Sequence, residues 1–338
     1  MRFLLTDEQR AFGDSLDAML TSANAPAAAR AWAAGDPAPG LALWSRLAEA
    51  GVFALAAPEA YEGVGPLPVE LVVAFAALGR HAVPGPVVET VAAAALLTRL
   101  ADSGEAGPAK RLLPGLVTGE STATLAIRGR GPYALDADVA GMTLVVSEAG
   151  AAPGPGAGPA SSLRIAPGHG PVRVSADPAR RLAVPAAGGE VVADGVEVAR
   201  AAAYAGDVAR LVTAAQALGV GLALLDRTVA YVKQRTQFGV PVGSFQAVKH
   251  RLADTLIGLE FARPLLYGAA LSMATADIAA AKVTAGEAAY AAARAALQLH
   301  GAVGYTDEFD LSLWLRKARP LRDAWGTPAH CRARVLAG

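Results

Sequence analysis

The chain has 338 residues, 30 basic and 30 acidic side chains, and 53% hydrophobic residues. This composition is enough for two or three folded domains and excludes wholesale disorder. The zero net charge gives no indication of a nucleic-acid partner, and the single cysteine, Cys331, excludes an internal disulfide framework and fits a reducing compartment.

The beginning of the chain does not have the pattern of an export signal. Asp7 and Glu8 stand where a basic and then apolar run would be needed, so we expect a cytoplasmic protein. No uninterrupted apolar stretch reaches about 18 residues, which predicts no membrane span. The five histidines lack the spacing of metal ligands, so we expect no metal site.

Residues 1–118 are predicted to form an N-terminal helical domain. Thr6 and Gln9 have the spacing of a capping box at the start of an amphipathic helix. A second helix is expected at residues 41–50, where Gly51 can end it. A third, apolar helix follows a turn-rich stretch at residues 58–68 and must end before Pro84.

Residues 119–202 are predicted to form a small β domain. Short β-prone runs such as ATLAI, MTLVVSE, SLRIA, PVRVS, RLAV and EVVADGVEV alternate with Gly and Pro, which indicates a small barrel or sandwich. The low-complexity stretch GAAPGPGAGPASS at residues 150–162 is expected to be a mobile loop. Its glycines lack the strand-to-helix context of a phosphate-binding motif.

Residues 203–338 are predicted to form a C-terminal bundle of four helices. From Val208 to Val232, apolar residues recur every three or four positions, which predicts one long amphipathic helix. A second helix starts near Phe245, and a third is expected at residues 278–299. The fold class is therefore α+β and mainly α, with a small β domain between two helical domains that pack together.

The loop between the first two of these helices has residue types suited to a nucleotide. It reads QRTQFGVPVGSFQAVKHRLAD and begins at Gln234. The planar guanidinium of Arg235 can hold a phosphate with two hydrogen bonds, and Phe238 can stack on a flat ring. Gln246 can bond an adenine edge. A plain helix–helix turn with a surface Arg235 and a core Phe238 explains the same residues without any ligand.

A second segment, QLHGAVGYTDEF, ends the last long helix. Gln298 is followed by Gly301 and Gly304, and glycines at such a place let the backbone approach a ligand closely. An ordinary helix end followed by a turn is the alternative. His300 beside Gly301 is expected to be a helix-end histidine with a backbone partner.

The two segments together resemble the acyl-CoA dehydrogenase family of flavoproteins. Stretches such as LLTDEQRAF, DPARRLAV and DEFDLSLWLRKAR extend the resemblance over nearly the whole chain. In that family, an R-x-x-F-G loop and a Q-x-x-G-G-x-G segment grip the ADP part of an FAD that belongs mainly to a neighbouring subunit. Ala302 stands where the family has its second glycine. The resemblance implies these FAD-binding residues: Arg235, Gln237, Phe238, Gln246, Gln298, Gly301 and Ala302.

The resemblance also shows what this sequence lacks. Family members abstract the α-proton of an acyl-CoA with a glutamate, and the two positions available for it are Ala209 and Trp325 here. Neither side chain can accept a proton, and Asp207 lies about 200° away from Ala209 around a helix. An E-P-x-x-G-S-D loop, a Trp–Thr pair beside the flavin and a C-terminal extension are also missing, so we expect no catalytic residue.

This pattern resembles the short subunit of the α2β2 heteromeric acyl-CoA dehydrogenases known from actinobacterial sterol side-chain degradation. The resemblance implies a non-catalytic or half-site subunit, inactive alone. It would share FAD with a full-length acyl-CoA dehydrogenase partner that carries the glutamate and acts on a bulky, steroid-like acyl-CoA. Two alternatives stay open: a flavin-free structural protein, or a self-sufficient homo-oligomeric flavoenzyme with its base at Asp207, Asp226, Asp307 or Glu308.

Overall fold

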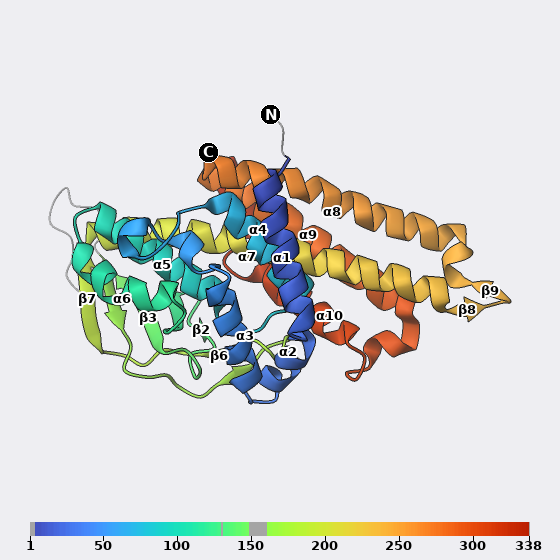
Figure 1. Cartoon of the computed structure of the whole chain (residues 1–338), viewed down its shortest axis with the longest axis horizontal. Helices are drawn as coiled ribbons and strands as arrows, with labels where there is room; N and C mark the ends of the chain where they lie inside the picture. The colour runs from blue at the N-terminus through green and yellow to red at the C-terminus, as the bar shows by residue number, and fades with distance from the viewer. Residues whose placement is uncertain (1–3, 130, 149–160, 338) are drawn as a thin grey trace. The chain divides into compact units, whose positions relative to one another are not determined.

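The computed structural model describes residues 4–129, 131–148 and 161–337 and confirms the mainly helical fold with small central sheets (Figure 1). Most of the predicted mobile loop at residues 150–162 lies outside the described residues, although Ser161 and Ser162 belong to a strand. The described chain forms two compact units, each built from segments that are distant in the sequence. The division at residues 118 and 202 stays a prediction about domains.

The first unit comprises Met1–Arg30, Val72–Val83 and Arg210–Gly338, so N-terminal helical segments group with the C-terminal helices as expected. The second comprises Ala31–Leu71 and Pro84–Ala209. The α-helices of the described residues are α1 (Asp7–Ser22), α2 (Ala25–Ala33), α3 (Ala38–Glu49), α4 (Pro68–Arg80), α5 (Val87–Asp102), α6 (Ala106–Val117), α7 (Val196–Gln234), α8 (Gln246–Ser272), α9 (Thr275–His300), α10 (Leu311–Asp323) and α11 (Pro328–Leu336).

Local sequence signals explain several of the helix ends. The capping box of α1 is confirmed, because Thr6 Oγ1 accepts from the Gln9 N–H at 3.2 Å and Gln9 Oε1 accepts from the Thr6 N–H at 3.0 Å. Gly51, with a φ of 77°, follows α3 where the sequence predicted a helix end. Short 3-10 helices are η1 (Ala54–Ala56), η2 (Glu59–Tyr61), η3 (Val242–Ser244) and η4 (Gly301–Tyr305).

Two small sheets lie in the second unit. In the larger sheet the order is β1-β3-β4-β7, with β1 and β3 parallel and the other pairs antiparallel. The smaller sheet has the order β2-β6-β5, and small apolar residues such as Ala126, Ala134 and Ala183 form a buried cluster. The strands are β1 (Ala123–Ile127), β2 (Ala134–Leu135), β3 (Met142–Glu148), β4 (Ser161–Ile165), β5 (Arg173–Val174), β6 (Arg181–Ala183) and β7 (Glu190–Gly195).

A buried carboxyl group supports the second unit. Asp136 is fully buried with a φ of 51°, and its Oδ1 accepts from Trp32 Nε1 at 3.2 Å and from the Arg181 N–H at 3.1 Å. Its Oδ2 has no hydrogen-bond partner among the described residues. Burial raises the pKa of Asp136 to about 7, against the lowering effect of the Trp32 hydrogen bond. The folded unit therefore favours the neutral acid.

The first unit is a bundle in which α7, α8 and α9 run alongside one another (Figure 1). Glycines allow the closest approaches. A Cβ at Gly79 would overlap the Gln216 carbonyl oxygen, and one at Gly219 would overlap the Ala76 carbonyl oxygen, so the backbones of α4 and α7 touch here. A Cβ at Gly221 would lie 3.2 Å from Ala289 Cα on α9. The contacts between these helices are therefore made by small residues, glycine and alanine, rather than by large side chains.

Two expectations about α7 are wrong. The helix begins at Val196 rather than near residue 203, because Gly195 ends β7 with a φ of 111° and Val198 is buried on the first helical turn. The helix is also not amphipathic, since residues 205–221 are all buried. Among the described residues, α7 alone is long and apolar enough to cross a membrane, but its most apolar window is completely buried inside the protein.

Candidate functional site

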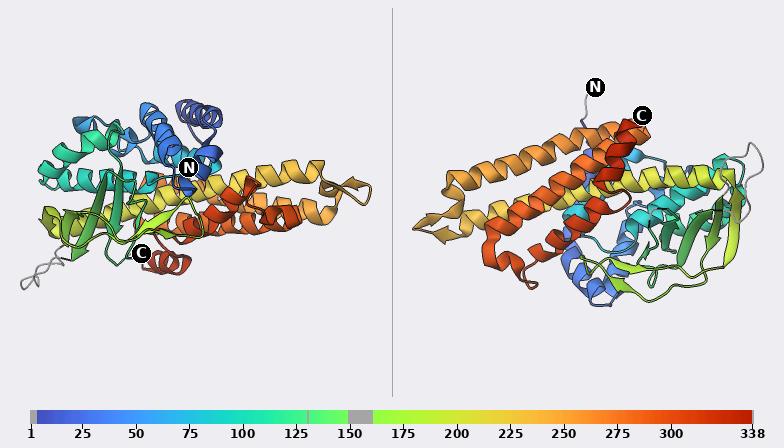
Figure 2. Two further views of the ribbon diagram at one scale, coloured as in Figure 1. Left: turned by 90° about the horizontal axis from the view of Figure 1, so that it is seen from below. Right: turned by 180° about the vertical axis from the view of Figure 1, so that it is seen from behind.

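The loop after α7 forms a β-hairpin that the sequence had predicted only as a turn. β8 (Thr236–Gln237) pairs with β9 (Val240–Pro241), and the two residues between them have positive φ values, 53° for Phe238 and 79° for Gly239. Two positive φ values in a two-residue loop define a type I′ turn. Figure 2 shows the hairpin projecting beyond the ends of α7 and α8.

Phe238 is 92% exposed, which excludes the alternative of a core phenylalanine. Its one recorded ring neighbour is Phe245, at 6.3 Å between ring centroids in an edge-to-face arrangement. A left-handed backbone is unfavourable for an aromatic residue, costing about 1–2 kcal/mol. Neither packing nor backbone preference therefore accounts for Phe238, and an observed outlier of this kind points to a functional constraint.

Polar side chains stand around this hairpin. Arg235 directly follows α7 and is exposed, and its guanidinium forms no hydrogen bond or ion pair with another described residue. Gln237 lies on β8, where its Nε2 donates to the Thr236 carbonyl oxygen at 2.9 Å. Gln246 is exposed at the first position of α8. An exposed guanidinium with free donors and an exposed aromatic ring suit a phosphate-bearing aromatic ligand.

The second predicted segment lies at the end of α9. Gln298 is exposed on the last helical turn, and Gly301 ends the helix with a φ of 62°. No atom outside its chain neighbours lies within 4 Å of an added Cβ at Gly301, so open space faces this backbone. Ala302 is exposed in η4. The glycine-rich turn is thus accessible to a ligand.

Tyr231 and His300 bring the two segments to the same end of the bundle. The rings stack at 4.2 Å between centroids, and the Tyr231 hydroxyl donates to the His300 carbonyl oxygen at 3.3 Å. Tyr231 is four residues before Arg235, whose N–H donates to the Tyr231 carbonyl oxygen at 2.9 Å. His300 directly precedes Gly301. No sequence pattern pointed to Tyr231, whereas the backbone partner expected for His300 is present: its Nδ1 lies 2.8 Å from the Ala296 carbonyl oxygen.

The carboxylates considered as relocated bases are mostly occupied elsewhere. Asp226 pairs with Arg80 at 2.8 Å, and Asp307 pairs with Arg316. Arg30 holds the loop before α10, donating to the Asp307 and Glu308 carbonyl oxygens at 2.8 and 3.4 Å. Asp307 and Glu308 are exposed, as expected for a solvated turn. Asp207 is buried within α7.

The two positions expected for a catalytic base, Ala209 and Trp325, lie close together in the fold, because the residues that follow them contact each other. Ala209, which is fully buried, precedes Arg210, and Trp325 precedes Gly326. A Cβ at Gly326 would lie 3.2 Å from Arg210 Nε, so these two residues are neighbours. Trp325 has a left-handed φ of 57° and Gly326 a φ of 148°. The backbone turn is special, but no carboxylate stands at either base position.

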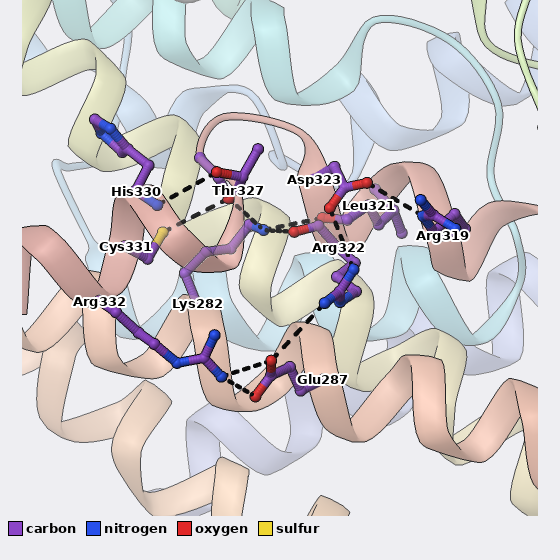
Figure 3. A network of polar contacts seen from close by, with 11 residues as sticks. Lys282, Glu287, Arg319, Leu321, Arg322, Asp323, Thr327, His330, Cys331 and Arg332 are labelled. Carbon is purple, nitrogen blue, oxygen red and sulfur yellow. Dashed lines mark hydrogen bonds and ion pairs between the residues drawn. The ribbon is translucent and has the colours of Figure 1, made fainter.

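Lys282 holds this turn from below, as Figure 3 shows. Its Nζ, on the fully buried face of α9, donates to the carbonyl oxygens of Leu321, Arg322 and Gly326 at 3.0, 2.9 and 3.4 Å. A cation here also suits the negative end of the α10 dipole. Lys282 was not among the residues predicted for the site, although a lysine among the apolar positions of an alanine-rich helix is a detectable signal. Cys331 is buried against the same turn, its Sγ 3.6 Å from the Gly326 carbonyl oxygen.

Arg128 and Gly129 form a turn directly after β1 in the second unit. A cavity of about 470 Å³ opens there in the second unit. Its wall is largely apolar, with Arg128 and Arg164 as its cationic members. Arg164 is fixed because its NH1 donates to the Ala186 carbonyl oxygen at 3.0 Å. Among the described residues, no group of three or more His, Cys, Asp or Glu side chains could hold a metal ion.

Comparison with known proteins assigns the family. The family model for the acyl-CoA dehydrogenase N-terminal domain matches residues 6–120, and the model for the C-terminal domain matches residues 193–337. The chain belongs to the acyl-CoA dehydrogenase family. Members of this family normally bind FAD. The fold described above is therefore that of a flavoprotein family.

Three relatives span nearly the whole chain. Acyl-CoA dehydrogenase IpdE2 of Mycobacterium tuberculosis is 29% identical over 92% of this chain and 91% of its own length. The Tcur3481-Tcur3483 steroid acyl-CoA dehydrogenase variant G363A has a TM-score of 0.81 at 26% identity, covering 98% of this chain and 97% of the other. The ChsE4-ChsE5 complex of M. tuberculosis has a TM-score of 0.82 at 25% identity, covering 100% and 98%.

Proposed function

We propose that the chain is a half-site subunit of a heteromeric, FAD-dependent acyl-CoA dehydrogenase, and that it completes the FAD pocket of a partner subunit. The observation that carries this proposal is an asymmetry. The nucleotide-type residues of the hairpin are present and exposed, whereas the two base positions hold Ala209 and Trp325. A subunit that supplies only the first of these parts needs a partner for the second.

The described residues fit the ADP part of FAD. Arg235 would bind the pyrophosphate, Phe238 would stack on or wall off a ring, and Gln246 would bond a polar edge. Gln237, Gln298, Gly301 and Ala302 complete the set that we assign to the cofactor. Bound FAD supplies the acceptor for hydride in this family. The role of this chain is to bind and orient the nucleotide, not to move a proton.

The partner would be a full-length acyl-CoA dehydrogenase subunit that carries the catalytic glutamate. A carboxylate at Ala209 would meet a completely buried position, and Trp325 offers only an indole ring whose N–H donates and cannot accept a proton. Proton abstraction must therefore come from outside these two positions. The heteromeric naming of the ChsE4-ChsE5 and Tcur3481-Tcur3483 structures supports a partner of the same family.

Helix α8 offers a surface for such a partner. Its inner stripe, which includes Leu259, Ala262 and Leu266, is buried in the bundle. A second stripe on the opposite side is exposed and includes Ile257, Phe261 and Leu265, with Phe261 70% exposed. These positions repeat every four residues and so share one face. A helix that is apolar on two faces has one face to bury against another chain.

The substrate we propose is a bulky, steroid-like acyl-CoA, dehydrogenated between its α and β carbons by the complex. Support comes from the steroid activity named for the Tcur3481-Tcur3483 enzyme, which resembles this chain over its whole length. A complex in which only part of the subunits carry a base can leave more room at each working site. This step rests on the resemblance to relatives rather than on a cavity in the chain.

Flavin content tests the proposal directly. The chain would be purified alone and then with a candidate full-length partner, and bound flavin would be quantified from its visible absorption. We expect no stoichiometric flavin in the chain alone and one FAD per pair of unlike subunits in the complex. One FAD per chain that is bleached by an acyl-CoA would show a self-sufficient enzyme. Complexes that never hold FAD would indicate a structural protein.

A further inference from the structure

His300 occupies an unusual position for a histidine. It is the last residue of α9 and is 4% exposed, with Tyr231 stacked on its ring at 4.2 Å and Phe309 at 5.6 Å. Its Nδ1 lies 2.8 Å from the Ala296 carbonyl oxygen. Because a carbonyl oxygen can only accept, Nδ1 must carry the proton, and a neutral ring then leaves Nε2 as a bare acceptor.

The second nitrogen explains why the ring must stay neutral. Nε2 is buried and has no hydrogen-bond partner among the described residues. A second proton would place a positive charge in this apolar enclosure, and burial accordingly lowers the pKa of His300, against a smaller raising effect of the Ala296 hydrogen bond. A charged ring would carry a second N–H with no acceptor among the described residues, which favours a shift of the ring toward solvent.

Within the part of the chain that the structure describes, no charged neighbour offsets this cost. Burial and the Ala296 carbonyl oxygen are the causes of the pKa shift, and no ionised side chain is among them. Asp310 is engaged by Arg30 at 2.9 Å, and Arg227 lies over the Trp314 ring at 3.8 Å. The charged residues on the surrounding elements are Arg227, Lys233 and Arg235 on α7, Arg294 on α9, and Asp307, Glu308 and Asp310 in the loop before α10.

A continuous path joins His300 to both nucleotide segments. On one side, His300 directly precedes Gly301 and η4. On the other side, the backbone carbonyl oxygen of its stacking partner Tyr231 accepts a hydrogen bond from the Arg235 N–H. The Arg235 carbonyl oxygen in turn accepts from the Val242 N–H at 2.8 Å, which closes the hairpin. Every link in this path is short and lies in the first unit. The ring therefore fixes the spacing between the two segments.

We infer that His300 is a positioning residue: its neutral ring joins the Gly301 turn to the Arg235 hairpin, so that acidification uncouples the two and releases the nucleotide. This inference deepens the proposed function and rests on it for the identity of the nucleotide. The residue contacts neither reacting atoms nor a proton in transit. Its effect is transmitted through the Tyr231 stack.

Three variants separate the parts of this mechanism. His300→Phe keeps an aromatic ring for stacking but cannot be charged. His300→Ala removes both the ring and its titration. Tyr231→Phe keeps the stack and removes only the hydroxyl donor to the His300 carbonyl oxygen, so it serves as the matched control. Each variant would be compared with the unmodified chain in circular dichroism before any binding measurement.

The first measurement needs no FAD and no partner. Amide hydrogen exchange in the chain alone should accelerate in His300→Ala at both residues 235–242 and residues 301–305, whereas Tyr231→Phe should leave residues 301–305 close to the unmodified chain. Labelled-histidine NMR should show the Nδ1–H tautomer of His300. Faster exchange confined to residues 301–305, or an Nε2–H tautomer, would overturn the inference whatever the cofactor is.

The second measurement follows FAD affinity of the partner complex between about pH 8 and about pH 4.5, a range that extends well below the ordinary histidine pKa because burial lowers the pKa of His300. The unmodified complex should lose affinity on acidification, while His300→Phe should lose this pH dependence and retain affinity at high pH. His300→Ala should weaken FAD about 2- to 12-fold at both ends, the value of one aromatic pair. An unchanged pH profile in His300→Phe contradicts the inference, and a complex without FAD at any pH contradicts the proposed function instead.

Discussion

Two aromatic residues with left-handed backbones, Phe238 and Trp325, stand at the two places that distinguish this chain. Their φ values are 53° and 57°, and a glycine follows each. Phe238 sits on an exposed hairpin with one aromatic neighbour, Phe245. Trp325 sits on a turn held by the buried Lys282 and adjoined by Cys331. The left-handed backbone of Phe238 is therefore maintained without core packing, whereas that of Trp325 is held by buried residues.

The difference shows that the two turns are maintained for different reasons, the one at Gly326 by packing in the core and the one at Phe238 by something outside the core. The turn at Gly326 is part of the fold, because Lys282 satisfies three carbonyl oxygens there, so it needs no catalytic role to be maintained. The hairpin at Phe238 contributes little to the core, so the proposal assigns its exposed side chains to a ligand or a partner. Four predictions test this contrast, from the largest expected effect to the smallest.

Replacing Lys282 by Met should destabilise the chain strongly. The substitution leaves buried carbonyl oxygens of Leu321 and Arg322 without their donor, and we expect the free energy of unfolding to fall by about 2–4 kcal/mol. Chemical denaturation measures this loss. Lys110→Met, at an exposed position on α6, is the control and should change the value by less than about 0.5 kcal/mol. A loss below about 1 kcal/mol for the Lys282 variant would mean that the turn is supported elsewhere.

Replacing Arg235 by Ala should affect the nucleotide and not the fold. The loss of a charge-assisted contact should weaken FAD binding to the complex by about 1.5–3 kcal/mol, or roughly 10- to 150-fold. Fluorescence titration of the apo-complex with FAD measures this change. Arg251→Ala on the exposed side of α8 is the matched control, for which we expect no more than a twofold change in affinity, about 0.4 kcal/mol. Full FAD occupancy of the Arg235 variant at low FAD concentration would remove Arg235 from the proposed site.

Replacing Phe238 by Asn should stabilise the isolated chain while impairing the complex. Asn-Gly is the preferred pair for a type I′ turn, so relief of the left-handed backbone should raise the free energy of unfolding by about 0.5–1 kcal/mol. The same variant should bind FAD more weakly. Tyr133→Asn, an exposed aromatic with an ordinary backbone that lies outside both nucleotide segments, controls for loss of surface area. A stable variant with unimpaired FAD binding would show that the strain has no role in cofactor binding.

Restoring a carboxylate alone should give no activity. Ala209→Glu and Trp325→Glu each place an acid at an expected base position, but neither restores the missing ring-binding loop. We expect no acyl-CoA-dependent reduction of an electron-acceptor dye by either variant in the absence of a partner. Trp325 is only partly buried, so its variant tests the point even where Ala209→Glu fails to fold. Robust turnover by either homo-oligomer would contradict the half-site proposal.

Sequence patterns predicted much of the fold but not its supports. The capping box at Thr6 and the helix end at Gly51 are local signals, and they appear in the structure as expected. The hairpin escaped detection because a phenylalanine fills a turn position that normally takes Asn or Asp. The all-round burial of α7 escaped because its alanines and glycines, such as Gly219 and Gly221, count as weak apolar signals yet permit the closest helix contacts.

The candidate site divided in the same way. Arg235, Phe238 and Gln298 carry their chemistry in their own side chains, so the sequence could nominate them, although their binding roles stay predictions. Tyr231 and Lys282 act through residues 69 and 39–44 positions away, and no local pattern reports such distances. Tertiary contacts of this kind become visible only when the helices are placed side by side.

The buried acid of the second unit has a consequence for handling the protein. Because the pKa of Asp136 rises to about 7 in the fold from an ordinary value of 3.8, its contribution to stability is complete below about pH 4 and disappears as the pH rises through about 7. His300 shifts in the opposite direction, so acidification favours one unit and disfavours the other. A single melting temperature taken near neutrality would therefore conceal two opposing pH dependences.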